Sequence, residues 1–131
     1  MPLINVRTSV SSIENPELLL QELSRELAVM TGKPEKYVMA FLETDVPMLF
    51  SGSKDPSCYI EIKSIGAIKP SDMSEVFCRM VSSKTGIPSS RIYIIFEDIP
   101  AKYWGWDGRT FGWYNLKIGQ IIYGFEINFS T

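Results

Sequence analysis

One stretch of this sequence occurs twice, and the repeat limits the possible folds more than any other feature. Residues 31–34 read Thr-Gly-Lys-Pro, and residues 85–88 read Thr-Gly-Ile-Pro. A second pair of similar segments, residues 4–8 and 60–64, has nearly the same separation. Two matches at nearly one offset indicate that about half of the chain is duplicated, so both copies should fold alike.

The first copy has the pattern of a strand, a helix and a second strand. Residues 3–8 alternate apolar and polar side chains, as a half-buried strand does. Asn15 is placed to cap a helix that has Pro16 at its first position, and Gly32 is placed to end it. Residues 37–46 are mostly apolar and predict the second strand. The helix is expected to bury one stripe, made of Leu20, Leu23, Leu27 and Met30.

The second copy repeats this order, with a strand at 58–65, a helix at 71–85 and a strand at 91–99. Its helical stripe is predicted to be Met73, Val76, Phe77, Met80 and Val81. A strand-helix-strand unit favours a right-handed crossover between parallel strands. The predicted fold is therefore α/β (α+β), with two β-α-β units forming a four-stranded mixed sheet that carries two helices on one face.

The two outer strands predict self-association. Residues 38–42 and 92–96 are apolar at nearly every position, which is typical of strands that are buried on both faces. Two helices cover only one face of the sheet. A second copy of the chain is the simplest cover for the other face. The alternative is that these side chains fill a tight monomeric core.

The residue types exclude several kinds of chemistry. The chain has no histidine, which removes the usual general base and the commonest transition-metal ligand. Cys58 and Cys78 lie far apart, without a metal-binding or redox spacing, and are predicted to be reduced and partly buried. No metal or cofactor is predicted. Any proton transfer must use another group.

Charge and hydropathy exclude two classes of partner. The net charge is −2 and no basic cluster is present, so nucleic acid is not an expected partner. No apolar run is long enough to span a membrane. The first residues lack the pattern of a signal peptide. The predicted location is the cytoplasm, with secretion that needs no signal peptide as the alternative.

A set of short motifs carries a resemblance. They are Met1-Pro2, residues 31–34 with Tyr37, Ser64-Ile65-Gly66, residues 91–94, and Gly105-Trp106 followed by Thr110-Phe111. In this order and spacing they resemble the macrophage migration inhibitory factor family of the tautomerase superfamily. The resemblance covers about residues 1–111, the predicted domain. It implies the fold of that superfamily and a homotrimer with active sites between subunits.

The resemblance also implies a cofactor-independent keto–enol tautomerase that acts on phenylpyruvate, a small aromatic 2-oxo acid, and on dopachrome. Its general base is the amine of Pro2, which removal of Met1 sets free. Burial and a nearby cation lower the pKa of such an amine from about 8 toward neutrality, where a base is most effective. By the same resemblance, Lys33 and the backbone of Ile65 hold the substrate carboxylate. An aromatic slot is implied for Tyr37, Trp106 and Phe111, with Tyr93 supplied by the neighbouring subunit.

Each of these residues also has a purely structural interpretation. Proline is common at position 2, and Lys33 is placed to complement the dipole of the preceding helix. Tyr93, Trp106 and Phe111 are residue types that usually fill cores or interfaces. Two other functions stay open. One is a signalling or binding protein in which tautomerism is incidental, and the other is decarboxylation of a similar aromatic acid on the same proline.

Three sites depart from the family pattern. Ile95 stands where the family often has an asparagine that faces the far end of the substrate ring, which predicts a preference for phenylpyruvate over its hydroxylated relative. Ser57 and Ile60 replace the Cys-x-x-Cys motif of vertebrate members, which predicts no oxidoreductase activity. Ser12 replaces an arginine used for receptor engagement, which weakens a cytokine-like role although Asp45 is present.

A fourth departure is length. The family usually ends near Phe111, but this chain continues through residues 112–131, and residues 119–129 contain many strand-forming side chains. The segment is predicted to add an edge strand, to cover a neighbouring subunit, or to be an appended extension. It follows the slot residues closely, so a further alternative is that it narrows the mouth of the site.

Overall fold

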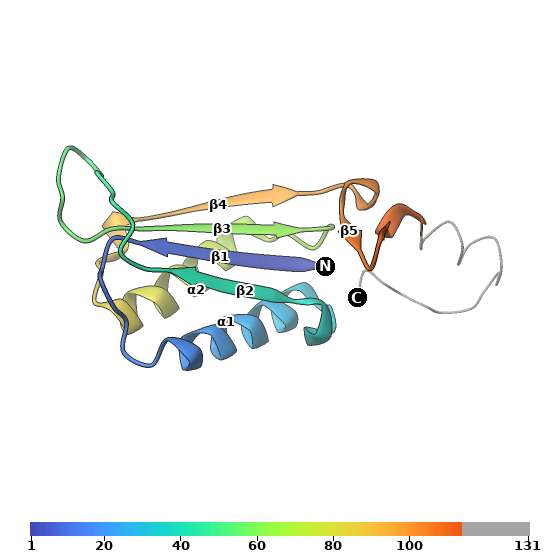
Figure 1. Cartoon of the computed structure of the whole chain (residues 1–131), viewed down its shortest axis with the longest axis horizontal. Coiled ribbons are helices and arrows are strands. Elements are labelled where there is room, and N and C mark those ends of the chain that lie inside the picture. Colours follow the sequence, from blue (N-terminus) through green and yellow to red (C-terminus); the bar gives the residue numbers. More distant parts are fainter. Residues whose placement is uncertain (114–131) are drawn as a thin grey trace.

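The computed structural model describes residues 1–113, and residues 114–131 of the predicted extension lie outside the described residues. A four-stranded sheet has the order β2-β1-β3-β4. Helices α1 (Pro16–Thr31) and α2 (Pro70–Thr85) lie side by side on one face of it (Figure 1). The strands are β1 (Pro2–Thr8), β2 (Met39–Glu43), β3 (Cys58–Ser64) and β4 (Ile92–Asp98), and a small hairpin follows with β5 (Gly105–Trp106) and β6 (Arg109–Thr110).

The sheet is mixed, as the duplication predicts. β1 pairs with β2 in parallel, and β3 pairs with β4 in parallel. The two halves join through an antiparallel pairing of β1 with β3. The described residues also form three short 3-10 helices, at Glu35–Tyr37, Ser89–Arg91 and Ala101–Tyr103. The predicted fold class is confirmed.

The two helices end in equivalent ways. Gly32 follows α1 and Gly86 follows α2, with φ angles of 69° and 76°. These angles lie in the left-handed region that glycine adopts without strain. The next residue is then turned into the protein, and the first repeat has Lys33 there while the second has Ile87. Both are buried, with 5% and 1% of their surfaces exposed.

The predicted stripe of α1 is wrong by one residue at its start. Leu19, Leu23 and Leu27 are fully buried, whereas Leu20 is only half-buried. The residues that contact the sheet follow a spacing of four, and Leu19 continues that row toward the N-terminus. The predicted Met30 is half-buried and packs against the edge of the core.

The stripe of α2 is confirmed for its three buried members, Met73, Phe77 and Val81, while Val76 and Met80 are half-buried. The strand predicted at 37–46 is too long, because β2 contains only Met39–Glu43. The 3-10 turn before it ends at Tyr37, whose N–H donates to the Pro34 carbonyl at 3.1 Å. Pro34 fixes the φ angle at the start of this turn, so the strand begins only after the turn has ended.

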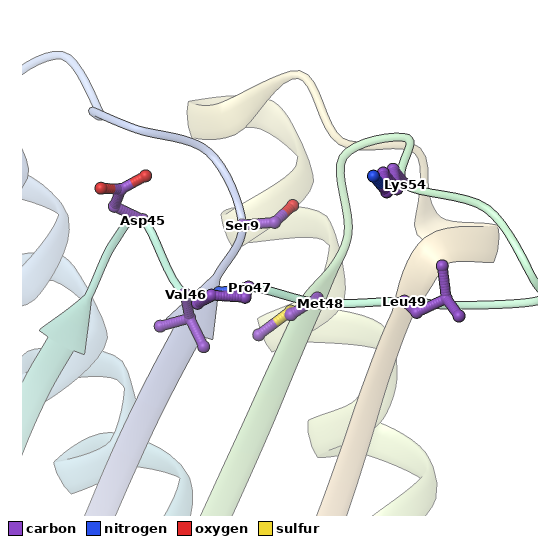
Figure 2. A pocket seen from close by; sticks show the side chains of 7 residues that line it. All are labelled: Ser9, Asp45, Val46, Pro47, Met48, Leu49 and Lys54. Carbon is purple, nitrogen blue, oxygen red and sulfur yellow. The ribbon is translucent and has the colours of Figure 1, made fainter.

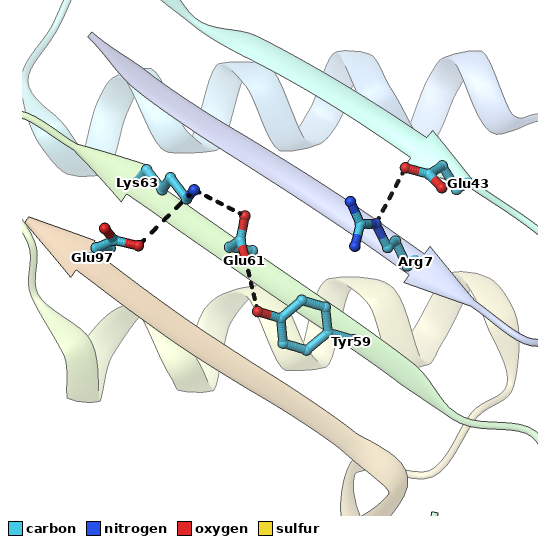
Figure 3. A network of polar contacts seen from close by, with 6 residues as sticks. All are labelled: Arg7, Glu43, Tyr59, Glu61, Lys63 and Glu97. Atoms are coloured by element: carbon cyan, nitrogen blue, oxygen red, sulfur yellow. Dashed lines mark hydrogen bonds and ion pairs between the residues drawn. The ribbon is translucent and has the colours of Figure 1, made fainter. Parts of the chain in front are cut away.

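Among residues 1–113, no element covers the face of the sheet that is turned away from the helices. Met39, Tyr93 and Ile95 are 60%, 62% and 50% exposed there. Charged side chains share this face (Figure 3), with Arg7 paired to Glu43 at 3.2 Å. Solvent-exposed pairs of this kind contribute only about 0–1 kcal/mol each. A second network joins Lys63 to Glu61 at 3.5 Å and to Glu97 at 3.9 Å, and Tyr59 donates to Glu61 at 2.8 Å.

Candidate active site

A cavity of about 250 Å³ lies at the end of the sheet where β1 begins. It brings together four of the predicted site residues, because Pro2, Tyr37, Trp106 and Phe111 all line it. The remaining lining residues are Met1, Leu3, Lys36, Val38, Met39, Trp104 and Gly105. Strand β1, the turn before β2 and the β5–β6 hairpin therefore meet at one place.

Three aromatic rings form a wall of this cavity. The Tyr37 ring meets Trp106 edge-on at 5.7 Å between centroids and Phe111 edge-on at 6.3 Å. Trp106 and Phe111 are nearly parallel at 6.1 Å. Phe111 is buried, whereas Trp106 is 45% exposed. The wall therefore runs from the interior out to solvent and suits a flat aromatic ligand.

The hairpin that carries Trp106 turns at Asp107 and Gly108, whose φ angles are 52° and 77°. Two consecutive positive φ angles are typical of the tight turn that joins antiparallel strands, and Asp-Gly is a favoured pair for it. The Phe111 N–H donates to the Trp104 carbonyl at 3.0 Å. This bond fixes Phe111 next to Trp106.

The amine at the start of β1 is electrostatically unusual. Met1 is only 2% exposed, and burial, assisted by the positive charge of Lys33, lowers the pKa of its amine from about 8 to about 5. Both causes disfavour the protonated form. A neutral amine is thus held beside an apolar cavity at neutral pH. Pro2 follows directly and pairs with Ser64 across the sheet.

Lys33 and Ile65, the two residues predicted to hold the substrate carboxylate, contact each other. The Lys33 Nζ donates to the Ile65 carbonyl at 2.8 Å. Burial lowers the pKa of Lys33, and the carboxylate of Asp98 opposes that shift. Asp98 also accepts a hydrogen bond from the Gly66 N–H at 2.9 Å, which holds the loop after β3. Neither Lys33 nor Ile65 lines the cavity itself; they lie beside it.

Tyr93 is not brought to this cavity within one chain. It lies at the start of β4, whereas the residue of β4 level with Pro2 is Asp98. Five residues of strand separate them, which corresponds to about 17 Å. Tyr93 instead packs edge-on against Phe50, with ring centroids 4.8 Å apart.

Sequence reasoning missed three residues near the site. Lys36 and Trp104 line the cavity. Lys36 belongs to a Pro-x-Lys-Tyr segment at 34–37, and Trp104 directly follows a second such segment at 100–103. The repetition of this segment is visible in the sequence. Ser64 was missed because only the strand register places it opposite Pro2. Its hydroxyl is buried and has no hydrogen-bond partner among the described residues.

A larger cavity, of about 610 Å³, lies at the opposite end of the sheet (Figure 2). Asp45 and Lys54 stand on its rim, and Met48 and Leu49 supply apolar surface. It contains no aromatic ring and no buried amine among its lining residues. Size alone therefore does not locate the chemistry, and the smaller cavity is the better candidate.

Both cysteines of the chain are free thiols and lie within residues 1–113. No group of three potential metal ligands is present among residues 1–113. Both cysteines are unpaired, and burial raises the pKa of Cys58 to about 12. A thiol of this kind is not reactive at neutral pH. No helix within residues 1–113 has the length and apolar character needed to cross a membrane.

The duplicated β-α-β sheet has the fold of the tautomerase superfamily. The family model described as macrophage migration inhibitory factor (MIF) matches residues 1–112. The chain belongs to the macrophage migration inhibitory factor family, and the resemblance found in its motifs is confirmed.

Relatives and solved structures agree with this assignment. Macrophage migration inhibitory factor of Meriones unguiculatus is 39% identical over 114 residues, which cover 85% of this chain and 99% of the relative. The crystal structure of a homologue from Prochlorococcus marinus matches with a TM-score of 0.81 and 53% identity, covering 84% of this chain and 99% of that one. The Trichinella spiralis protein matches with a TM-score of 0.77 and 31% identity, covering 82% and 98%.

Proposed function

We propose that this protein is a cofactor-independent keto–enol tautomerase of aromatic 2-oxo acids such as phenylpyruvate, with Pro2 as the general base. One observation carries the proposal: a buried amine at the start of β1, whose pKa falls to about 5 beside Lys33, adjoins a cavity walled by aromatic rings. An amine that is neutral at pH 7 can accept a proton, which an ordinary ammonium group cannot.

Removal of Met1 is part of the proposed mechanism. Met1 lines the cavity and is buried there, so its loss would vacate space for substrate. It would also leave the secondary amine of Pro2 in nearly the same surroundings. Burial and the Lys33 charge then act on the new amine in the same direction, and the base stays neutral.

The proton balance is simple. The neutral Pro2 amine removes a proton from the carbon beside the ketone. The ammonium formed in this way then returns a proton to the ketone oxygen, which gives the enol and restores the neutral amine. The reverse sequence converts enol to ketone. Lys33 is proposed to bind the carboxylate, while the rings of Tyr37, Trp106 and Phe111 hold the aromatic group. The cycle is redox-neutral and consumes no co-reactant.

The direct test is ultraviolet-monitored ketonisation of enol-phenylpyruvate, with the intact mass of the protein measured alongside. Turnover by protein that starts at Pro2 supports the tautomerase. Absence of turnover from such protein would favour the alternative, a signalling or binding protein on the same scaffold. Retention of Met1 in active protein would exclude Pro2 as the base.

A homotrimer with shared active sites is the proposed assembly. The exposed apolar side chains Met39, Tyr93 and Ile95 need cover, and Tyr93 is too distant to reach the cavity of its own chain. In a closed ring, each cavity would receive Tyr93 from its neighbour.

Mixing two impaired variants should test this arrangement. Chains with Pro2→Gly and chains with Tyr93→Ala are each expected to be weakly active. When they are unfolded and refolded together, random assembly should restore roughly a quarter of the sites, which take an intact Pro2 and an intact Tyr93 from different chains. Light scattering checks that the particles contain three chains of 14.9 kDa. No recovery in mixed trimers would contradict a site that is shared in this way.

Ile95 is proposed to set the preference for an unsubstituted ring. It lies two residues after Tyr93 on the same face of β4 and cannot accept or donate a hydrogen bond. We expect phenylpyruvate to be preferred over 4-hydroxyphenylpyruvate, and Ile95→Asn to raise the relative kcat/KM of the hydroxylated substrate by roughly three- to tenfold, as one hydrogen bond would. Ile95→Val is the matched control and should leave the ratio unchanged. An unchanged ratio in Ile95→Asn would rule out contact with the ring hydroxyl.

A further inference from the structure

Two short turns of this chain have the same construction. Each begins at a proline, contains a lysine and ends at a tyrosine, at Pro34–Tyr37 and at Pro100–Tyr103. The tyrosine N–H donates to the proline carbonyl at 3.1 Å in the first turn and 2.9 Å in the second. In both turns the lysine ammonium stands over the tyrosine ring, at 5.1 Å and 5.2 Å from the centroid.

The two turns differ in what they face. Lys36 and Tyr37 line the cavity that contains Pro2, whereas Lys102 and Tyr103 do not. The Tyr37 ring is itself part of the aromatic wall, so the ammonium of Lys36 is held beside that wall. An ammonium over an aromatic face is attracted to it, which restrains a side chain that is otherwise very mobile.

The side chains that line this cavity include a cation and no anion. No aspartate or glutamate of residues 1–113 lines it, and no ion pair of the described residues involves Lys36. Lys33 adds a second cation beside the same cavity, close enough to lower the pKa of the Met1 amine. The carboxylate of Asp98 already acts on Lys33, whereas no acidic side chain among residues 1–113 is paired with Lys36.

We propose that Lys36 is a second anion-binding residue of this cavity and that the favoured substrates are dianions, namely aromatic 2-oxo acids with a second carboxylate. This inference rests on the proposed function. Lys33 would hold the carboxylate next to the ketone. Lys36, at the aromatic wall, would hold the second one. A cation with no acidic partner among the described residues binds an anion without first breaking an ion pair. Lys36 is exposed, so solvent screens this attraction and keeps it modest.

Two matched ligands test the inference without turnover. Benzylmalonate and 3-phenylpropanoate share a ring and differ by one carboxylate, and all their carboxyl groups are ionised at about pH 7.5. Their dissociation constants can be measured by calorimetry on the processed protein. We expect the dianion to bind more tightly, and its advantage to shrink as salt is added.

Substitution of Lys36 gives the decisive comparison. Lys36→Gln should reduce the advantage of the dianion by roughly three- to fivefold, the size expected for a partly exposed ion pair, while Lys36→Arg should keep it. Lys102→Gln removes the same charge from the same kind of turn outside the cavity and should leave the advantage intact. The inference is overturned if Lys36→Gln keeps the wild-type ratio, if Lys102→Gln lowers it equally, or if neither ligand binds.

The result of the Lys36 binding test can be distinguished from the result of the turnover test of the tautomerase proposal. An unchanged ratio in Lys36→Gln, together with turnover of enol-phenylpyruvate, would remove the dianion preference and leave the enzyme intact. A ratio that depends on Lys36 in protein without turnover would support the anion site and contradict the tautomerase.

Discussion

Replacement of Pro2 by glycine is expected to lower kcat/KM for enol-phenylpyruvate by about 100-fold. General acid–base catalysis typically contributes about 100- to 10,000-fold, and the new terminal glycine would retain an amine that replaces part of this. What is lost is the secondary amine on a rigid ring whose φ is fixed. Glycine is the most mobile residue and would hold its amine poorly against the substrate.

Two controls are needed for Pro2→Gly: one for removal of Met1 and one for correct assembly. Intact mass must show that Met1 is absent from both proteins, because only then does residue 2 carry the amine. Light scattering and thermal unfolding should be close to those of the wild type, since the main chain of residue 2 is paired with Ser64 in either case. Unchanged turnover in a processed, correctly assembled variant would exclude proline as the base.

Replacement of Lys33 by alanine should have the second-largest effect, a rise in KM of roughly 10- to 100-fold for substrates that carry a carboxylate. A hydrogen bond to a charged group contributes about 1.5–3 kcal/mol, which corresponds to this range. The variant also removes a cation that lowers the pKa of the amine. The base acts when it is deprotonated, so activity rises with pH through that pKa. In Lys33→Ala the rise should move to higher pH.

Lys69 provides a control for the structural alternative. Its Nζ donates to the Met30 carbonyl at 3.0 Å, so Lys69 also places a cation at the end of α1. If Lys33 acts only on the helix dipole, Lys33→Ala and Lys69→Ala should resemble each other, with lower stability and unchanged KM. A rise in KM and a shifted pH profile in Lys33→Ala alone would establish the binding role.

Much of the fold follows from local signals in the sequence. Asn15, Pro16 and Gly32 were predicted to delimit α1 and do so. The repeat predicted the same order of strand, helix and strand for the second half. The helix there begins at Pro70, one residue before its predicted start. The error at Leu20 has a physical origin. Residues 18–20 of α1 are three consecutive leucines, and only contact with the sheet decides which of them faces it.

The site was predictable in part. Resemblance grouped Pro2, Tyr37, Trp106 and Phe111, and the structure places all four around one cavity. Lys36 escaped notice because an exposed lysine in a turn is usually solvated, and only the fold shows which way this one lies. Tyr93 is distant from the cavity of its own chain, so its role in the site stays a prediction.

The two helices end in equivalent ways, but the residues that follow them have opposite effects on the stability of the fold. The first repeat buries Lys33 where the second buries Ile87, behind glycines of the same conformation. Burial of an ammonium group opposes folding, whereas burial of an isoleucine side chain favours it by about 1.5–3 kcal/mol. An apolar residue such as Ile87 is what stability alone would favour at the buried position after the helix. Burial of Lys33 therefore lowers the stability of the fold at the end of the sheet where the proposed active site lies.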